Sequence, residues 1–244
     1  MTQTPVLSEL QQKDNLCGAF QAARVLRELG FDGVDEDTVA LRAGSVLPVD
    51  PEGSVPPGET SRTDYRFDLP TVPPAESGTA AGPLAAAIES LSDGALRAVP
   101  LCGSWTAERV ERLVDESDAR LLANIRTGPL WGTHPSIETV IEELAGGGAE
   151  GPPSDWDVGH FVELVTLVRG AGGSLVLVHD SYPSFGWNAR HLQPPRAVAA
   201  ALQRGDEREG GVLAVVPAED ASRIEALAAE LRLDVAAWDN GTRT

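Results

Sequence analysis

Two apolar runs in the second half of the chain constrain the fold more than any other feature. Residues 161–168 are almost wholly apolar, residues 169–173 read as a turn, and residues 174–178 are apolar again. Two such runs, joined by a short glycine-containing turn, are typical of a β-hairpin. The sequence therefore predicts an antiparallel sheet in this half of the chain.

Helical periodicity dominates the first half. Apolar residues recur on one stripe after Leu16, which predicts a helix that begins there, is capped by Asp14 or Asn15 and stops at Gly30. The tail from Leu233 either adds an edge strand or stays loose. Further helices are predicted at 37–43, 83–91, 106–116, 136–145, 194–204 and 221–231, and further strands at 96–101, 121–126 and 211–216. Helices followed by an antiparallel sheet indicate an α+β fold, here a single domain over residues 1–244.

Two segments interrupt this pattern. Residues 45–82 are dense in Pro, Gly, Ser and Thr, and residues 146–159 are rich in Gly and Pro. A loop as long as 45–82 within a compact domain is functional or inserted. We interpret it as an insertion that is partly disordered or covers another part of the molecule.

Charge and composition narrow the classes of function. The formal net charge is −18, which repels phosphate backbones and disfavours nucleic-acid binding. No apolar stretch approaches the ~20 residues that a membrane helix needs, and residues 1–12 lack the features of a secretory signal. Cys17 and Cys102 do not have the spacing of metal ligands, and no cofactor motif occurs. We therefore expect a cytoplasmic protein without metal or cofactor.

Cys17 is the residue with the clearest chemical potential. It is placed in the first turn of the predicted helix, where unpaired N–H groups and the helix dipole favour a thiolate. Gln11, six residues earlier, can fold back and donate its amide to an oxyanion together with the Cys17 N–H. Gln12 is the neighbouring alternative for this role. The alternative is that Cys17 has no chemical role and is a small apolar residue in the core.

His160 and Asp180 are the candidate partners of the thiol. His160 can take the thiol proton and return it to a leaving group. A hairpin loop of odd length places Asp180 on the same face as His160, where its carboxylate can orient the imidazole. A two-residue turn presents His179 there instead. Asn188 is a weaker candidate for the orienting role.

These residues carry a resemblance to a known superfamily. Gln11-x5-Cys17-Gly18 on a helix, then Gly159-His160-Phe161-Val162, and the stretch from Val176 to Tyr182 resemble papain-like cysteine peptidases, in particular the C39-like branch. The resemblance covers residues 8–30 and 155–185, and the interval between Cys17 and His160 is longer than is usual in that branch. It implies a papain-like fold in which Gln11, Cys17, His160 and Asp180 act as oxyanion donor, nucleophile, base and orienting carboxylate.

The predicted function is hydrolysis of an amide bond in a peptide or small protein by a Cys-His-Asp triad. The predicted substrate groove is lined by Gly18, Trp131, Gly159, Tyr182 and Trp187. Two alternatives stay open. One is an acyltransferase or amide-forming enzyme of the same fold, and the other is a catalytically inactive protein that binds a peptide.

Overall fold

The computed structural model describes residues 11–50 and 55–244. Residues 8–10 of the stretch that carries the resemblance, and 51–54 of the predicted insertion, lie outside the described residues. The helices are α1 (Cys17–Glu28), α2 (Glu36–Arg42), α3 (Ala81–Leu91), α4 (Ala107–Glu116), α5 (Ile137–Leu144), α6 (Pro195–Gln203) and α7 (Ala221–Leu231), with short 3-10 turns η1 (Pro74–Glu76) and η2 (Ala218–Asp220). The strands are β1 (Leu47–Pro48), β2 (Thr71–Val72), β3 (Leu96–Cys102), β4 (Arg120–Arg126), β5 (Gly159–Arg169), β6 (Ser174–His179), β7 (Arg190–Gln193), β8 (Gly211–Pro217) and β9 (Asp234–Val235).

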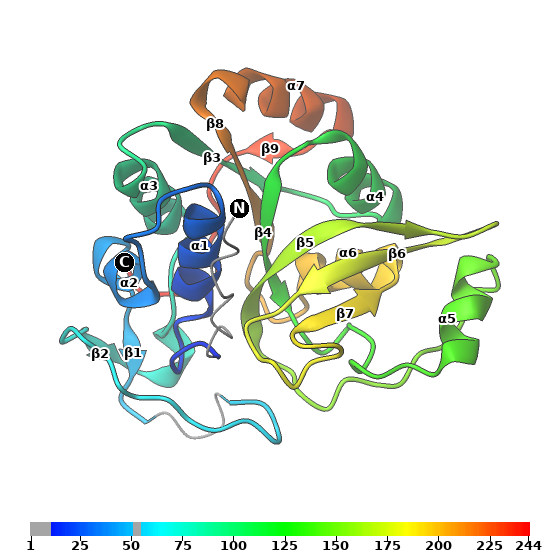
Figure 1. Cartoon of the computed structure of the whole chain (residues 1–244), viewed down its shortest axis with the longest axis horizontal. Helices are drawn as coiled ribbons and strands as arrows, with labels where there is room; N and C mark the ends of the chain where they lie inside the picture. The colour runs from blue at the N-terminus through cyan, green and yellow to red at the C-terminus, as the bar shows by residue number, and fades with distance from the viewer. Residues whose placement is uncertain (1–10, 51–54) are drawn as a thin grey trace, which may run out of the picture.

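One antiparallel sheet organises the described chain. Its strands lie in the order β7-β6-β5-β4-β8-β3-β9. The helices α4, α6 and α7 pack on one face of the sheet, and α1 and α3 cover the other, so two separate apolar cores form (Figure 1). The α+β class predicted from the sequence is confirmed.

The predicted elements need three corrections. The sheet is not confined to the second half, because β3 and β4 pair with β8 in the same sheet. Strand β7 is not predicted from the sequence because its four residues show no clear alternation, and neither are the two-residue strands β1 and β2 within the 45–82 loop. The first helix begins at Cys17 with Leu16 as its N-cap, and no side chain caps it, so neither Asp14 nor Asn15 does so.

The loop at 45–82 braces the segment before α1. The Asp14 N–H donates to the carbonyl of Arg62, and the Arg62 N–H donates to the Asp14 carboxylate at 3.0 Å. The Tyr65 hydroxyl donates to the Asp14 carbonyl, and the Lys13 ammonium donates to the Asp64 carbonyl at 2.6 Å. The part of this loop that the structure describes therefore covers and fixes the entry to the first helix.

The pairing of β5 with β6 contains an irregularity that sets the register. Arg169 pairs with Ser174, so the loop between them has four residues, 170–173, an even number. An even loop alone would put His179 on the face of His160. Val165 has no partner on β6, and this β-bulge shifts the register so that Glu163 pairs with His179. The extra residue returns Asp180 to the face of His160.

Helix α1 packs on the sheet where β5 begins. A Cβ atom on Gly18 would lie 3.1 Å from the ring of Phe161 and 3.2 Å from Leu84, so the glycine allows a close approach of helix to strand. Phe161 is only 2% exposed. This contact fixes the distance between the start of α1 and the start of β5.

Phe161→Ala should lower the free energy of unfolding by about 3–5 kcal/mol, because it leaves a cavity between α1 and β5. Urea denaturation followed by circular dichroism measures this change. Val168→Ala on the same strand, at an exposed position, is the control and should cost less than about 1 kcal/mol. Equal losses for the two variants would contradict the role given to Phe161.

Candidate functional site

Cys17 is the first residue of α1 and lines a cavity. Its side chain is half-buried and forms no disulfide. The first turn of α1 contains no acidic residue, so its N–H groups present positive potential beside the sulfur. Position and exposure together make the sulfur accessible to a reagent.

His160 lies above the same cavity and reaches the sulfur. Both side chains line the same cavity, and the Cys17 sulfur is one of the groups that raise the pKa of the imidazole. Its Nε2 atom lies 3.1 Å from Oδ1 of Asp180, and both residues are 2% exposed. The structure thus brings Cys17, His160 and Asp180 together in one chain of contacts.

The hydrogen bonds around Asp180 define the protonation of His160. Oδ1 of Asp180 also accepts the backbone N–H groups of Ser181 at 2.7 Å and Tyr182 at 3.2 Å. Burial raises the pKa of Asp180, but His160 and His191 outweigh it and hold that pKa well below its usual value. An ionised carboxylate only accepts hydrogen bonds, so Nε2 of His160 carries a proton. Nδ1 is therefore the nitrogen left to exchange a proton with the sulfur.

The same contacts favour the charged imidazole. Burial lowers the pKa of His160, but the Asp180 carboxylate and the contact with Cys17 more than offset this and raise it to about 10. An imidazolium held between a carboxylate and a sulfur stabilises negative charge on both. This is the electrostatic arrangement that a thiolate nucleophile needs.

Aromatic rings separate the His160–Asp180 pair from solvent. Tyr182 stacks on the imidazole with ring centroids 5.9 Å apart, and the edge of Trp156 meets it at 5.0 Å. Trp156 is held in place because its carbonyl accepts a hydrogen bond from the Thr127 hydroxyl at 2.5 Å. Water is kept away from the pair, which strengthens the attraction between carboxylate and imidazolium.

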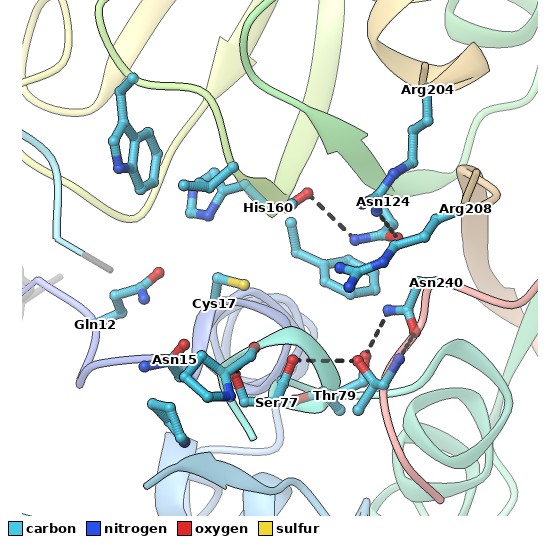
Figure 2. Close-up of a pocket in the computed structure, with 18 of the residues that line it drawn as sticks. Gln12, Asn15, Cys17, Ser77, Thr79, Asn124, His160, Arg204, Arg208 and Asn240 are labelled. Atoms are coloured by element: carbon cyan, nitrogen blue, oxygen red, sulfur yellow. Dashed lines mark hydrogen bonds between the residues drawn. The ribbon is translucent and has the colours of Figure 1, made fainter. Parts of the chain in front are cut away.

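Gln12, and not Gln11, lines the cavity beside Cys17 (Figure 2). Gln11 donates its amide to the carbonyl of Thr60, in the bracing loop. The buried Gln12 accepts a hydrogen bond from the Ser181 hydroxyl at 2.5 Å and donates to the Lys13 carbonyl at 3.3 Å. These bonds orient the carboxamide and leave the second hydrogen of its Nε2 without a partner among the described residues.

Asn15 is a second amide at the cavity. Its Nδ2 atom is buried without a hydrogen-bond partner among the described residues, and its φ is +61°. Buried donors without partners are rare and call for an explanation such as a ligand. The hydroxyl of Tyr182 is in the same condition. Two residues of the cavity lining thus each hold a buried donor that has no partner among the described residues.

The other predicted site residues divide into two groups. Gly159 and Tyr182 line the cavity. Gly18 faces Phe161, Trp131 is buried in a separate cluster around Leu175, and Trp187 is 68% exposed, so none of these three lines it. The rival orienting residues also lie elsewhere, since His179 faces Glu163 at 3.9 Å and Asn188 is exposed.

Several lining residues were not anticipated from the sequence. Trp156 was the only aromatic residue in the 146–159 loop, and its position four residues before His160 was the one usable signal. Asn124, Arg204, Arg208 and Asn240 also line the cavity, and they come from segments far apart in the chain. No local pattern marks them, because only the folded sheet brings them together.

Among the described residues, no group of three His, Cys, Asp or Glu side chains is arranged to hold a metal ion. No helix in the described ranges has the length and apolar character to cross a membrane.

Comparison with known proteins gives a family but no activity. Residues 4–239 match the family described as "Family of unknown function (DUF6885)". The chain belongs to this family. No curated protein and no solved structure matches the chain. For this DUF6885 member, the geometry of the cavity is the feature that bears on function.

Asp180→Asn should bring the pKa of His160 from about 10 down to 6.5 or below, because burial then acts without an opposing carboxylate. An NMR titration of the imidazole nitrogens measures it, with His160→Gln to assign the signal. Asp157→Asn is the control. Asp157 lies three residues before His160 in the chain but pairs with Arg126, so its loss should leave the pKa of His160 unchanged.

The same pair of variants tests stability. The pKa of His160 is raised on folding, so its contribution is complete below pH 6.5 and is lost as the pH rises through 10. The pKa of Asp180 is lowered, so its contribution is present above pH 3.8 and is lost as the pH falls. Wild type should exceed Asp180→Asn most between pH 3.8 and 6.5. A stability difference that grows toward pH 10 would contradict this assignment.

Proposed function

We propose that this protein is a cysteine-dependent hydrolase that cleaves an amide bond in a peptide. The observation that carries the proposal is the convergence of Cys17, His160 and Asp180, with the sulfur and the imidazole on one cavity and the carboxylate bonded to the ring. A papain-like arrangement belongs to the same proposal, with the nucleophile at the start of α1, the base on β5 and the orienting carboxylate after β6.

The proposed reaction has two steps. The Cys17 thiolate forms a bond to the substrate carbonyl carbon, and the oxyanion is stabilised by the Gln12 amide and the Cys17 N–H. The C–N bond then breaks, and the leaving amine takes its proton from His160. In the second step His160 takes a proton from water, the hydroxide adds to the thioester, and the acid and the free thiol are released.

Asp180 and the aromatic rings support both steps. The carboxylate holds the imidazole with Nδ1 toward the sulfur and stabilises the cation. Trp156 and Tyr182 keep the ring in one orientation. A cytoplasmic location fits this proposal, since both cysteines are free and a reducing compartment keeps the nucleophile reactive.

Cys17→Ala should abolish labelling of the protein by iodoacetamide at pH 6–7. An ordinary thiol, with a pKa of about 8.5, reacts slowly at this pH, whereas a thiol paired with an imidazolium reacts rapidly. Mass spectrometry of the alkylated protein measures the reaction. Cys102→Ala is the matched control and should label like wild type. Equal labelling of wild type and Cys17→Ala would show that Cys17 is not the activated thiol.

Gln12→Ala should slow acylation of Cys17 by p-nitrophenyl acetate by about 10²–10³-fold, the usual effect of removing one oxyanion donor. Gln11→Ala should change it by less than about threefold, because that side chain is bonded to the loop outside the cavity. The burst of p-nitrophenolate measures both rates. A larger effect for Gln11→Ala than for Gln12→Ala would return the oxyanion role to Gln11.

A further inference from the structure

The cavity that begins at Cys17 contains two arginines on its other side. Its volume is about 230 Å³, and its lining includes Arg204 and Arg208, which lie between α6 and β8. Figure 2 shows the guanidinium of Arg208 projecting into the cavity across from Cys17 and His160. The proposed reaction does not use either arginine.

The two arginines differ in how their charge is balanced. Arg204 is held by both carboxylate oxygens of Asp206, at 3.0 and 2.7 Å, and is therefore neutralised. Arg208 donates to the carbonyl of Ala75 at 2.5 Å and forms no ion pair with any residue that the structure describes. A guanidinium has five N–H donors in a planar fork, so the half-buried Arg208 can make further hydrogen bonds to a group bound in the cavity that it lines.

The charge around Arg208 is unusual for this chain. The protein has 37 acidic and 19 basic residues, yet the lining contains two arginines and a single acidic residue, Asp50. A local positive charge in a cleft of an acidic protein attracts anions into that cleft. The pairing that a planar guanidinium makes best is with a carboxylate or a phosphate.

The dimensions of the cavity limit the substrate. A volume of about 230 Å³ is below the roughly 300–1,000 Å³ of sites for drug-sized ligands. On the side of Arg208, the Asn240 amide donates to the Thr79 carbonyl at 3.0 Å, which joins two of the lining segments. The space between Cys17 and Arg208 therefore holds only a short length of peptide, so a carboxylate bound to Arg208 lies close to the bond that Cys17 attacks.

We propose that Arg208 binds a carboxylate of the substrate, and that the peptide is cleaved close to its C-terminal carboxylate. The inference rests on the proposed function of Cys17. The thiolate adds to the carbonyl that precedes the terminal residue or residues, and the C–N bond breaks. The amine that leaves, with the carboxylate still on Arg208, takes its proton from His160. Water then releases the N-terminal part from Cys17.

The test compares two alkylating reagents that differ in charge. Iodoacetate is an anion and iodoacetamide is neutral, and both alkylate a thiolate. The rate of each at Cys17 is measured by mass spectrometry, and the ratio of the iodoacetate rate to the iodoacetamide rate reports the local attraction for a carboxylate. Arg208→Gln should lower this ratio at Cys17 by about fivefold, the order expected for the loss of one nearby charge.

Two controls isolate Arg208. Arg243→Gln removes a positive charge from an exposed side chain that pairs with Glu76 outside the cavity, and it should leave the ratio within about 1.5-fold of wild type. Cys102 in the same molecule should favour iodoacetamide, because burial and the nearby Asp234 and Glu209 raise the pKa of its thiol and repel an anion.

A second measurement identifies the source of the carboxylate. N-acetyl-trialanine should protect Cys17 from iodoacetamide in wild type, while its C-terminal amide should not, and the protection should disappear in Arg208→Gln. Better protection by inorganic phosphate than by the free peptide would overturn the carboxylate assignment. Equal protection by the acid and the amide would overturn it as well.

The outcomes separate this inference from the proposed function. Slow reaction of Cys17 with both reagents would refute the activated thiol itself. Fast reaction with iodoacetamide, together with the same rate ratio in wild type, Arg208→Gln and Arg243→Gln, would leave the hydrolase intact and overturn the role of Arg208.

Discussion

The register of β5 against β6 decides which side chain meets His160. The hairpin loop has an even number of residues, and on its own this would have placed a second imidazole, His179, beside the first. The unpaired Val165 reverses the parity, so that a carboxylate takes that place. The two neighbours have opposite effects on the charge of His160. A second imidazole would disfavour the imidazolium form of His160, whereas the Asp180 carboxylate stabilises it. The bulge therefore determines the electrostatics of the cavity from a point about five residues away along the strand.

Burying the charged pair is costly, and the surrounding contacts offset the cost. A carboxylate and an imidazolium that are both 2% exposed lose most of their hydration. Their mutual attraction alone does not always offset the free-energy cost of this desolvation. Two backbone N–H groups bond to the same oxygen of Asp180. Tyr182 supplies one of these N–H groups and also stacks on His160, so one residue both compensates the carboxylate and fixes the ring. The order Asp180-Ser181-Tyr182 thus assembles much of the site from three consecutive residues, with Ser181 holding Gln12.

The sequence was informative where a residue's role depends on local pattern. Most helices and strands were located, because apolar periodicity records which face is buried. Cys17, His160 and Asp180 were selected from their positions at the starts or ends of such elements. The choice between Asp180 and His179 could not be made, since it depends on a bulge whose residue, Val165, resembles its neighbours in the apolar run. Gln11 was preferred to Gln12 on spacing, whereas the structure bonds Gln11 to the carbonyl of Thr60, 49 positions away.

The loop at residues 45–82 shows why the cavity cannot be predicted from the sequence. Residues 45–82 read as an insertion because they lack periodicity, yet their described part holds the segment that ends in Cys17 through backbone bonds to Asp14. The same loop provides Ser77 and Thr79 to the cavity, and its Ala75 carbonyl accepts a hydrogen bond from Arg208. A segment that buries no apolar face can still be held in place by hydrogen bonds to the polar groups of another element. Such hydrogen bonds produce no periodic pattern of apolar residues in the sequence. The position of Cys17 at the start of a helix can be predicted from the residues around it. The cavity beside Cys17 cannot, because it is formed by segments that are far apart in the sequence and meet only in the folded protein.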